Sequence, residues 1–356
     1  MSSRADRVAA RLAPRGLDLL LVTDMVNLRY LTGFTGSSAF AVVGTDVRRF
    51  ITDFRYVEQA AQQVSGFDRE RAPQEYLAAL ADGWPAGELR VGFEDAHVSV
   101  KQHARLAEIV PSRVTLVPAG EVVEAERAVK DAGEVELIRA AAAVCDDVYD
   151  WLREWGIVGK PEREVAVALE HEMRRRGAEG PSFPSIVASG ERGALPHAVP
   201  TAEPIPRDTL VTLDLGVRMD GYCSDCTRTW ATGDVPQDLA DAYALVQRAQ
   251  AGAMAAVRPG MTGQEADAVA RDVIAAAGHG EHFGHSLGHG VGIDVHEGPR
   301  LARNNDEPLV AGNVVTVEPG VYLPGRGGVR IEDLVVLTEG GRDVLTRTTK
   351  DLLVVD

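Results

Sequence analysis

The sequence predicts an α/β N-terminal domain followed by an α+β C-terminal domain that contains an internal repeat. The length of 356 residues exceeds the roughly 150 residues of one typical domain, so two domains are expected. In the first third, short apolar runs alternate with polar turns and helical segments. After it, an order of helix, helix and hairpin occurs twice. We therefore expect one domain over residues 1–122 and a second over residues 123–356.

In the first domain, each expected strand is a short apolar run bounded by turn residues. Gly44, Thr45 and Asp46, for example, form a turn between two such runs. The alternation of strands with helices is typical of α/β domains. The expected strands are 19–22, 39–43 and 49–52, and the expected helices are 55–64 and 75–82.

The second domain is expected to open with two helices. Asp131 and Glu134 have the spacing of a capping box, which marks a helix start. The apolar residues that follow recur every three or four positions and form one stripe, so Cys145 within that stripe is expected in the core. Pro161 is at a favoured first-turn position, and Gly177 is typical of a helix end.

A hairpin and then a second copy of the series are expected to follow. The offset between copies is roughly 100 residues, since Glu164 in one short helix corresponds to Glu265 in the other. The first hairpin pairs 210–215 with 222–230; the second copy has helices over 239–257 and from the Thr262 cap to Gly278, and a hairpin that pairs 313–318 with 329–337.

Composition excludes several classes of protein. The net charge of −16 repels phosphate backbones, so nucleic acid is not an expected partner. No apolar run approaches the ~20 residues of a membrane span, and the N-terminus has no apolar signal core. Three cysteines are too few for a disulfide scaffold. A cytoplasmic location is therefore expected.

Two carboxylates in each predicted hairpin form the main chemical signal. They are Asp214 and Asp225 in the first, and Glu318 and Glu332 in the second. An ionised acid in an apolar strand costs several kcal/mol to bury unless cations compensate it. Any one of these acids alone is explained by a salt bridge or a strand end in solvent. The symmetric set of four instead predicts two divalent ions.

Five of the nine histidines fall within residues 279–296, where they can complete such a site. Imidazole suits transition metals better than Mg²⁺ or Ca²⁺, so oxygen-rich ligation with one nitrogen indicates Mn²⁺, Co²⁺, Fe²⁺ or Zn²⁺. Two other motifs fit less well. Gly284 to Gly288 has the G-x-S-x-G spacing of a serine nucleophile, but lacks the preceding strand and following helix. Cys223 and Cys226 have redox-motif spacing, but lie in a predicted strand.

The chain resembles the Xaa-Pro peptidases, the group of aminopeptidase P and prolidase. These enzymes have a pita-bread catalytic domain with a pseudo-two-fold repeat and a creatinase/prolidase-type N-terminal domain. The N-terminal likeness is at 27–37 (NLRYLTGFTGS). The catalytic motifs occur in family order at 212–217 (TLDLGV), 225–229 (DCTRT), 285–297 (HSLGHGVGIDVHE), 316–322 (TVEPGVY) and 328–333 (GVRIED).

The resemblance implies a dinuclear site and its catalytic residues. The metal ligands that match by position are Asp214, Asp225, His289, Glu318 and Glu332, with Asp225 and Glu332 bridging. All five are intact, which disfavours creatinase-type activity and the non-catalytic proteins of this fold. The expected catalytic residues are His197 and His296, which stabilise the intermediate or move protons, and Glu318, which relays a proton.

Four further residues are expected to bind substrate. His285 matches a histidine of the substrate pocket, and Tyr322 can contact a proline ring. Arg330 lies two residues from Glu332 on a strand face, where it can orient a ligand or a substrate carboxylate. Arg300 is a second carboxylate-binding candidate. For either arginine, a structural salt bridge remains an equal alternative.

The resemblance implies a metallo-exopeptidase that removes the N-terminal residue from peptides with proline at the second position, using a water activated between two ions. Manganese is the first expected metal, with Co, Zn or Fe as alternatives. A strict Xaa-Pro dipeptidase is the nearest alternative activity, and a catalytically silent peptide-binding protein is the alternative from another class. The resemblance also implies a homodimer.

Overall fold

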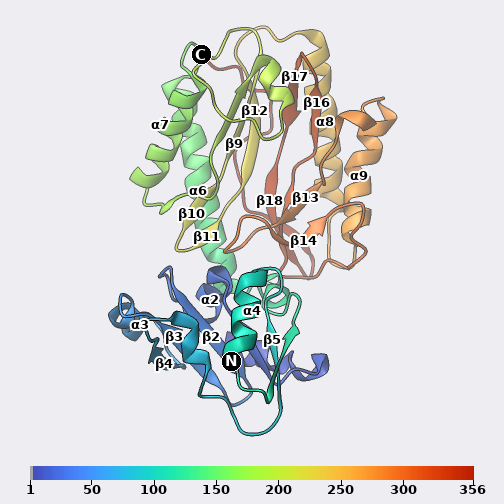
Figure 1. The fold of residues 1–356 in the computed structure, drawn as a ribbon. Helices are drawn as coiled ribbons and strands as arrows, with labels where there is room; N and C mark the ends of the chain where they lie inside the picture. Colours follow the sequence, from blue (N-terminus) through green and yellow to red (C-terminus); the bar gives the residue numbers. More distant parts are fainter. Residues whose placement is uncertain (1–2) are drawn as a thin grey trace. The chain divides into compact units, whose positions relative to one another are not determined.

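The computed structural model describes residues 3–356 and is shown in Figure 1. The chain divides into two compact units, of which the first ends at Arg127 and the second is Ala128–Asp356. The expected boundary after residue 122 falls slightly before this division. The reason is a short helix, α5 (Glu124–Arg127), whose Arg127 donates to buried Asn27 of the first unit.

The first unit is built on a six-stranded sheet with the order β4-β3-β2-β1-β5-β6. Its central strand β1 (Leu19–Val22) pairs antiparallel with β2 (Ala39–Gly44) and parallel with β5 (Leu89–Phe93). Because both faces of β1 and β2 are buried, these strands are continuous apolar runs. The other strands are β3 (Arg48–Thr52), β4 (Asp68–Arg71) and β6 (Val114–Pro118).

The helices of the first unit differ from expectation at one place. The predicted helix at 55–64 is present as α3 (Val57–Gln63), whereas the one at 75–82 is a 3-10 helix, η2 (Tyr76–Leu80). The remaining helices are α1 (Arg4–Ala10), α2 (Met25–Thr32), α4 (Val100–Ile109) and the 3-10 helix η1 (Ala13–Arg15).

Four long helices flank the sheets of the second unit, two on each side (Figure 1). The capping boxes at Asp131 with Glu134 and at Thr262 with Glu265 are both formed, as predicted. The helices are α6 (Ala132–Trp155) and α7 (Glu162–Arg175) on one side, and α8 (Gln237–Ala256) and α9 (Gly263–Ala276) on the other.

Both predicted hairpins of the second unit are present, but each is divided into a central strand pair and a separate short hairpin. Strand β9 (Leu210–Leu215) pairs with β12 (Cys226–Ala231), and β15 (Val314–Val317) pairs with β18 (Asp333–Thr338). The intervening residues form separate short hairpins instead of extending these strands. They are β10 (Val217–Met219) with β11 (Tyr222–Cys223), and β16 (Gly320–Leu323) with β17 (Gly327–Arg330).

Shorter elements complete the second unit. Strand β8 extends the β9 sheet, and β13, β14 and β19 extend the β15 sheet. Their bounds are β7 (Gly180–Pro181), β8 (Ile186–Ser189), η3 (Gly190–Ala194), η4 (Gly280–His282), β13 (Gly288–Gly290), β14 (Glu297–Leu301) and β19 (Gly341–Val344).

Two separate apolar clusters lie between the helices and the sheets. In one, Cys145 and Tyr149 of α6 pack with Trp230 of β12, so the expected core position of Cys145 is confirmed. In the other, residues of α8 and α9 pack against β15 and β18. Each half therefore buries its own helix pair mainly on its own sheet, as expected of a duplicated unit, and Leu210 and Ala231 of the first sheet join the second cluster. Across residues 3–356, no helix has the length and apolar character needed to span a membrane.

Candidate functional site

The four acids singled out in the sequence lie where the two central strand pairs begin or end. Asp214 is within β9, and Asp225 immediately precedes β12. Glu318 follows β15, and Glu332 precedes β18. Of the four acids, only Asp214 is inside a strand. The other three lie where the chain passes between a central strand pair and a short hairpin.

A direct backbone contact joins the two halves at this point. The amide of Glu332 donates to the carbonyl of Thr227 at 3.1 Å. The Thr227 hydroxyl in turn donates to Oε2 of Glu332 at 2.7 Å. Glu332 is therefore fixed beside the strand that Asp225 precedes. Sequence reasoning missed Thr227, although its position two residues after Asp225 on one strand face is a usable signal.

His289 of β13 faces these acids through one ring nitrogen. Its Nδ1 lies 3.1 Å from the carbonyl oxygen of Gly290, which can only accept, so Nδ1 carries the proton. Its Nε2 lies 3.3 Å from Oε1 of Glu318 and 3.6 Å from Oδ2 of Asp225. Asp225, His289 and Glu332 each offer a ligand atom, and these atoms all lie within 4.8 Å of one another.

The charges of the acids interact strongly. Burial, and then the negative charge of Glu332, raises the pKa of Asp225 well above its usual value. Burial, and then the charges of Glu318 and Asp214, raises the pKa of Glu332 in the same way. Burial alone would also raise the pKa of Glu318, but the hydrogen bond and charge of His289 outweigh it and lower the pKa to about 2.

The donor atoms fit a divalent cation. Three of the four predicted ligand acids each have a buried oxygen without a hydrogen-bond partner: Oδ1 of Asp214, Oδ1 of Asp225 and Oε1 of Glu332. Native structures rarely leave a buried carboxylate oxygen unsatisfied unless an ion or water completes it. Together with Nε2 of His289, these atoms form the oxygen-rich set with one nitrogen that suits a transition metal.

Arg330 of β17 is buried among the acids. Its Nη2 donates to Oδ2 of Asp214 at 2.6 Å, and its Nε donates to the Thr227 hydroxyl at 3.0 Å. Arg330 therefore forms a buried ion pair with a predicted ligand. Its expected role in binding a substrate carboxylate stays a prediction.

A polar chain runs from Arg330 through Tyr322 to His285. Nη1 of Arg330 donates to the Tyr322 hydroxyl oxygen at 2.8 Å. The same hydroxyl lies 2.8 Å from Nε2 of His285, whose Nδ1 faces the carbonyl of Ser286. Nδ1 therefore carries the proton, Nε2 accepts from Tyr322, and burial lowers the pKa of His285. Each group therefore donates to the next, from Arg330 through Tyr322 and His285 to the Ser286 carbonyl.

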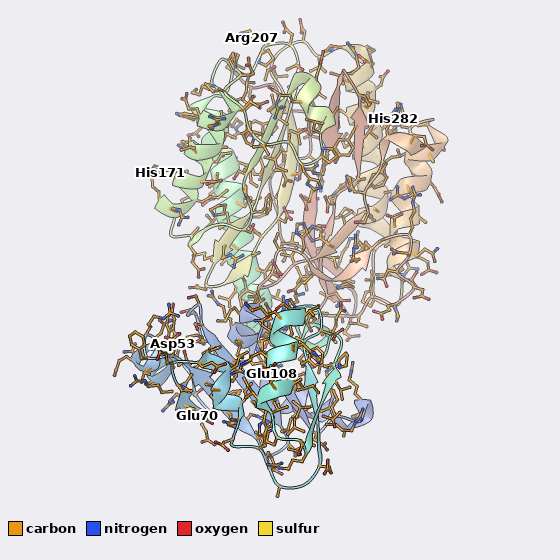
Figure 2. All side chains as sticks on the ribbon, in the orientation of Figure 1. Asp53, Glu70, Glu108, His171, Arg207 and His282 are labelled. Atoms are coloured by element: carbon orange, nitrogen blue, oxygen red, sulfur yellow. The ribbon has the colours of Figure 1, made fainter. Side chains whose placement is uncertain are left out.

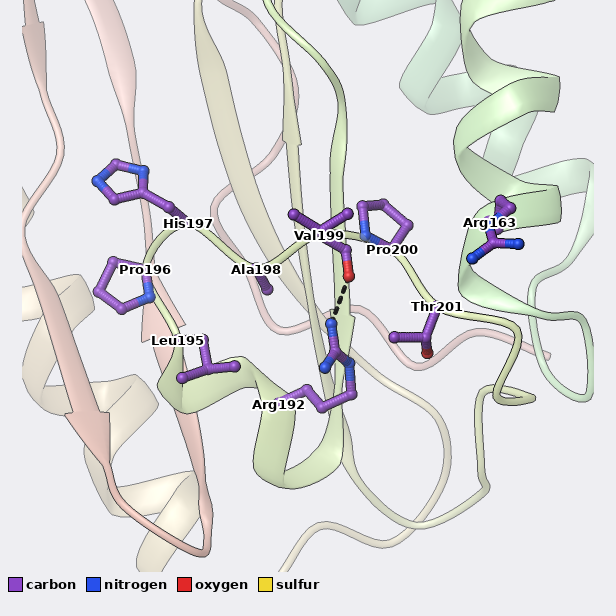
Figure 3. A pocket seen from close by; sticks show the side chains of 9 residues that line it. All are labelled: Arg163, Arg192, Leu195, Pro196, His197, Ala198, Val199, Pro200 and Thr201. Atoms are coloured by element: carbon purple, nitrogen blue, oxygen red, sulfur yellow. Dashed lines mark hydrogen bonds between the residues drawn. The ribbon is translucent and has the colours of Figure 1, made fainter.

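The remaining predicted residues line cavities or contact a predicted ligand. His285 and exposed Arg300 line one cavity of about 400 Å³. The ring of His296 lies 4.3 Å from that of His289, centroid to centroid. His197 is exposed and lines a second cavity, of about 560 Å³ (Figure 3). Within residues 3–356, His197 makes no hydrogen bond or ion pair, and its role stays a prediction.

Other histidines and both alternative motifs lie elsewhere or lack the needed context. His171 on α7 and His282 on η4 lie at opposite outer edges of the second unit in Figure 2. Ser286 is followed by strand β13 and not by a helix. Cys223 and Cys226 are buried free thiols, and burial raises the pKa of Cys223 to about 12. Neither motif has the geometry of a nucleophile.

Comparison with known proteins gives the family. A model of metallopeptidase family M24 matches residues 136–339, and a model of the creatinase/prolidase N-terminal domain matches residues 4–129. The Xaa-Pro dipeptidase of Pyrococcus furiosus is 34% identical over 358 residues, with 99% of this chain and 100% of the relative covered.

Two solved structures are similar over nearly the whole chain. A Xaa-Pro dipeptidase from Bacillus anthracis has a TM-score of 0.94 and 37% identity, with 99% of each chain covered. An X-Pro aminopeptidase from Thermotoga maritima has a TM-score of 0.88 and 35% identity, with 97% of this chain and 100% of the other covered. The predicted fold class is confirmed. The chain belongs to metallopeptidase family M24, and it is a peptide hydrolase with a creatinase/prolidase N-terminal domain and a pita-bread catalytic domain.

Proposed function

We propose that this metallopeptidase is an Xaa-Pro dipeptidase that requires divalent cations. The supporting observation is the convergence of Asp225, His289 and Glu332 beside unsatisfied carboxylate oxygens. The relatives named above favour the dipeptidase, which the sequence offered as the alternative, over the aminopeptidase that the sequence put first. The Thermotoga maritima structure keeps an aminopeptidase as the second candidate.

The residues that would hold two ions are those expected from the sequence. Asp225 and Glu332 would be shared between the ions, Asp214 would hold one, and His289 with Glu318 would hold the other. When bound, such ions lower the pKa of a water molecule and polarise the scissile carbonyl. The donor set suits Mn²⁺, Co²⁺, Zn²⁺ or Fe²⁺, and we propose Mn²⁺ first.

The protein's own groups would orient the substrate and move protons. Glu318 is the carboxylate expected to receive and pass on a proton. His296, whose ring lies next to that of His289 at an interplanar angle of 57°, and His197 are the imidazoles that would face the developing oxyanion. Tyr322 is held by Arg330 and His285, so its ring is fixed for contact with the proline ring.

In an Xaa-Pro dipeptide, the proline residue itself carries the free C-terminal carboxylate. Arg300 is exposed beside His285 in the 400 Å³ cavity, where a guanidinium can bind a carboxylate through two parallel hydrogen bonds. Longer peptides carry an amide at the same position and cannot make that charged pair. This difference supports selection of dipeptides.

Cleavage of matched peptides tests the proposal. Purified protein loaded with Mn²⁺ would be assayed on Ala-Pro, Ala-Pro-Ala and Ala-Ala. We expect hydrolysis of Ala-Pro, much less of Ala-Pro-Ala and none of Ala-Ala, with loss of activity on chelation and recovery when metal is returned. Equal cleavage of the tripeptide would indicate an aminopeptidase. Binding without hydrolysis under Mn²⁺, Co²⁺ or Zn²⁺ would indicate the silent peptide-binding alternative. The homodimer and the cytoplasmic location stay predictions.

A further inference from the structure

The carboxylate of Glu162, the first residue of α7, is fully buried and tied to both ends of one segment, residues 189–201. Its Oε1 accepts from the Ser189 amide at 2.8 Å and the Ser189 hydroxyl at 2.9 Å. Its Oε2 accepts from the Thr201 amide and hydroxyl and from Nε of Arg192, all at 3.0 Å. Five donors therefore converge on one carboxylate.

These contacts go beyond what capping of a helix requires. The acid of an ordinary capping box, such as Glu265 of α9, bonds only to the backbone three residues away. Glu162 instead bonds to residues far along the chain. Burial alone would raise the pKa of Glu162, but the hydrogen bonds from Ser189 and Thr201 outweigh it and lower the pKa. The carboxylate is therefore ionised and fully satisfied.

The opposite side of the segment is held against β17. Nη1 of Arg330 donates to the carbonyl of Pro196 at 3.2 Å. Gly193 packs so closely on Gly328 that a Cβ added to Gly328 would lie 2.0 Å from the Gly193 carbonyl oxygen. The segment is thus held between Glu162 and the strand that carries Arg330. His197 lies within this segment, in the loop between Arg192 and Thr201 (Figure 3).

We propose that Glu162 is a positioning residue that places His197 for the reaction, an inference that rests on the proposed function. His197 makes no hydrogen bond of its own among residues 3–356, so its place is set by the backbone on either side. That backbone is fixed by Glu162 at Ser189 and Thr201, while Arg192 donates both to Glu162 and to the Val199 carbonyl.

The second half of the domain contains a comparable arrangement, which supports this role independently. Asp267 of α9 is buried, binds Arg271 and accepts from the Leu287 amide at 2.9 Å. Arg271 donates to the carbonyls of Phe283, at 2.8 Å, and His285, at 2.7 Å. In each half, a buried acid on the second helix, paired with an arginine, holds the loop that carries a predicted site histidine.

A Glu162→Gln variant with a matched control tests the proposal. The control is Glu172→Gln, which removes another buried acid of α7 that pairs with Arg175 and Arg176 and does not contact residues 189–201. We expect hydrogen–deuterium exchange of metal-free protein to be faster over residues 189–201 in Glu162→Gln and unchanged there in Glu172→Gln.

The kinetic and binding measurements separate positioning from general stability. We expect kcat on Ala-Pro to fall roughly 10- to 100-fold in Glu162→Gln, as for a displaced catalytic group, with KM and Mn²⁺ affinity close to wild type. Glu172→Gln should retain kcat. If Glu162→Gln does not fold, the milder variant Ser189→Ala with Thr201→Val removes only two hydroxyl donors and should show the same effects in smaller size.

Two results would overturn the proposal: unchanged exchange over 189–201 in Glu162→Gln, or an equal loss of kcat in both variants. If wild-type protein hydrolyses no Xaa-Pro peptide, the proposed function fails. The exchange measurement still decides whether Glu162 holds the segment.

Discussion

Nη2 of Arg330 lies 2.6 Å from Oδ2 of Asp214, and both side chains are buried. The same guanidinium donates to the hydroxyls of Thr227 and Tyr322, so all three nitrogens of one planar group donate at once. Arg330 thereby offsets part of the negative charge of the acid cluster and fixes the orientation of a predicted ligand. A lysine has the charge but not this fork.

We predict that Arg330→Lys lowers kcat/KM on Ala-Pro by at least about 10-fold, because Asp214 and Tyr322 lose a shared support. Arg330→Met should also lower the free energy of unfolding by about 3–5 kcal/mol, since it leaves buried Asp214 without its cation. Steady-state kinetics and urea unfolding measure both effects. The control is Arg326→Lys, which should match wild type: Arg326 immediately precedes β17, is exposed and pairs with Asp238.

Metal binding should release protons. The pKa of Asp225 and that of Glu332 are raised by burial and by the neighbouring acids, so the metal-free site holds protons that ligation must displace. Calorimetric titration with Mn²⁺ at about pH 6.5, in two buffers of different ionisation enthalpy, measures the number released. The affinity should fall as the pH is lowered. Asp225→Asn should bind less metal and release fewer protons, and equal heats in both buffers would contradict the prediction.

The stability contributed by Glu162 should disappear in acid. Its pKa is lowered in the folded protein from the ordinary value of 4.5, so its contribution is present above that value and is lost as the pH falls through the folded pKa. We predict that the difference in unfolding free energy between wild type and Glu162→Gln is constant near neutral pH and shrinks below about pH 4.5. Urea unfolding across this range measures it, and a difference that grows in acid would be the wrong sign.

The sequence predicts the long helices well because their signals are local. The capping boxes at Asp131 and Thr262 and the apolar stripe around Cys145 lie within a few turns of the helices they define. The hairpins were placed less accurately. The run from 222 to 230 looks like one continuous strand, but strand pairing is interrupted between Cys223 and Cys226. The position of this break depends on which strands pair in the fold and not on the local sequence.

The residues of the site also differ in how far the sequence predicts them. The four acids could be predicted since they are unusual residues in apolar strands, whereas the choice of His289 among five nearby histidines depended on the family resemblance. The contact of Thr227 with Glu332 and the pairing of Arg330 with Asp214 could not be, because each joins residues more than a hundred positions apart. Glu162 gives no local signal at all, since its partners become neighbours only after β8 and η3 have folded back onto α7.

A last prediction concerns the buried ion pair between Lys130 and Glu297. Nζ of Lys130 lies 2.7 Å from Oε1 of Glu297, with side chains only 1% and 6% exposed, and Glu297 directly follows His296. Lys130→Met should therefore cost about 3–5 kcal/mol in unfolding free energy, because it leaves the carboxylate buried without its cation. The double variant with Glu297→Leu should cost less than the sum of the single changes, as expected for a coupled pair. Lys101→Met, at an exposed position of α4, is the control. Urea unfolding of the four variants and wild type gives the coupling energy, and strictly additive changes would mean that the two charges do not interact.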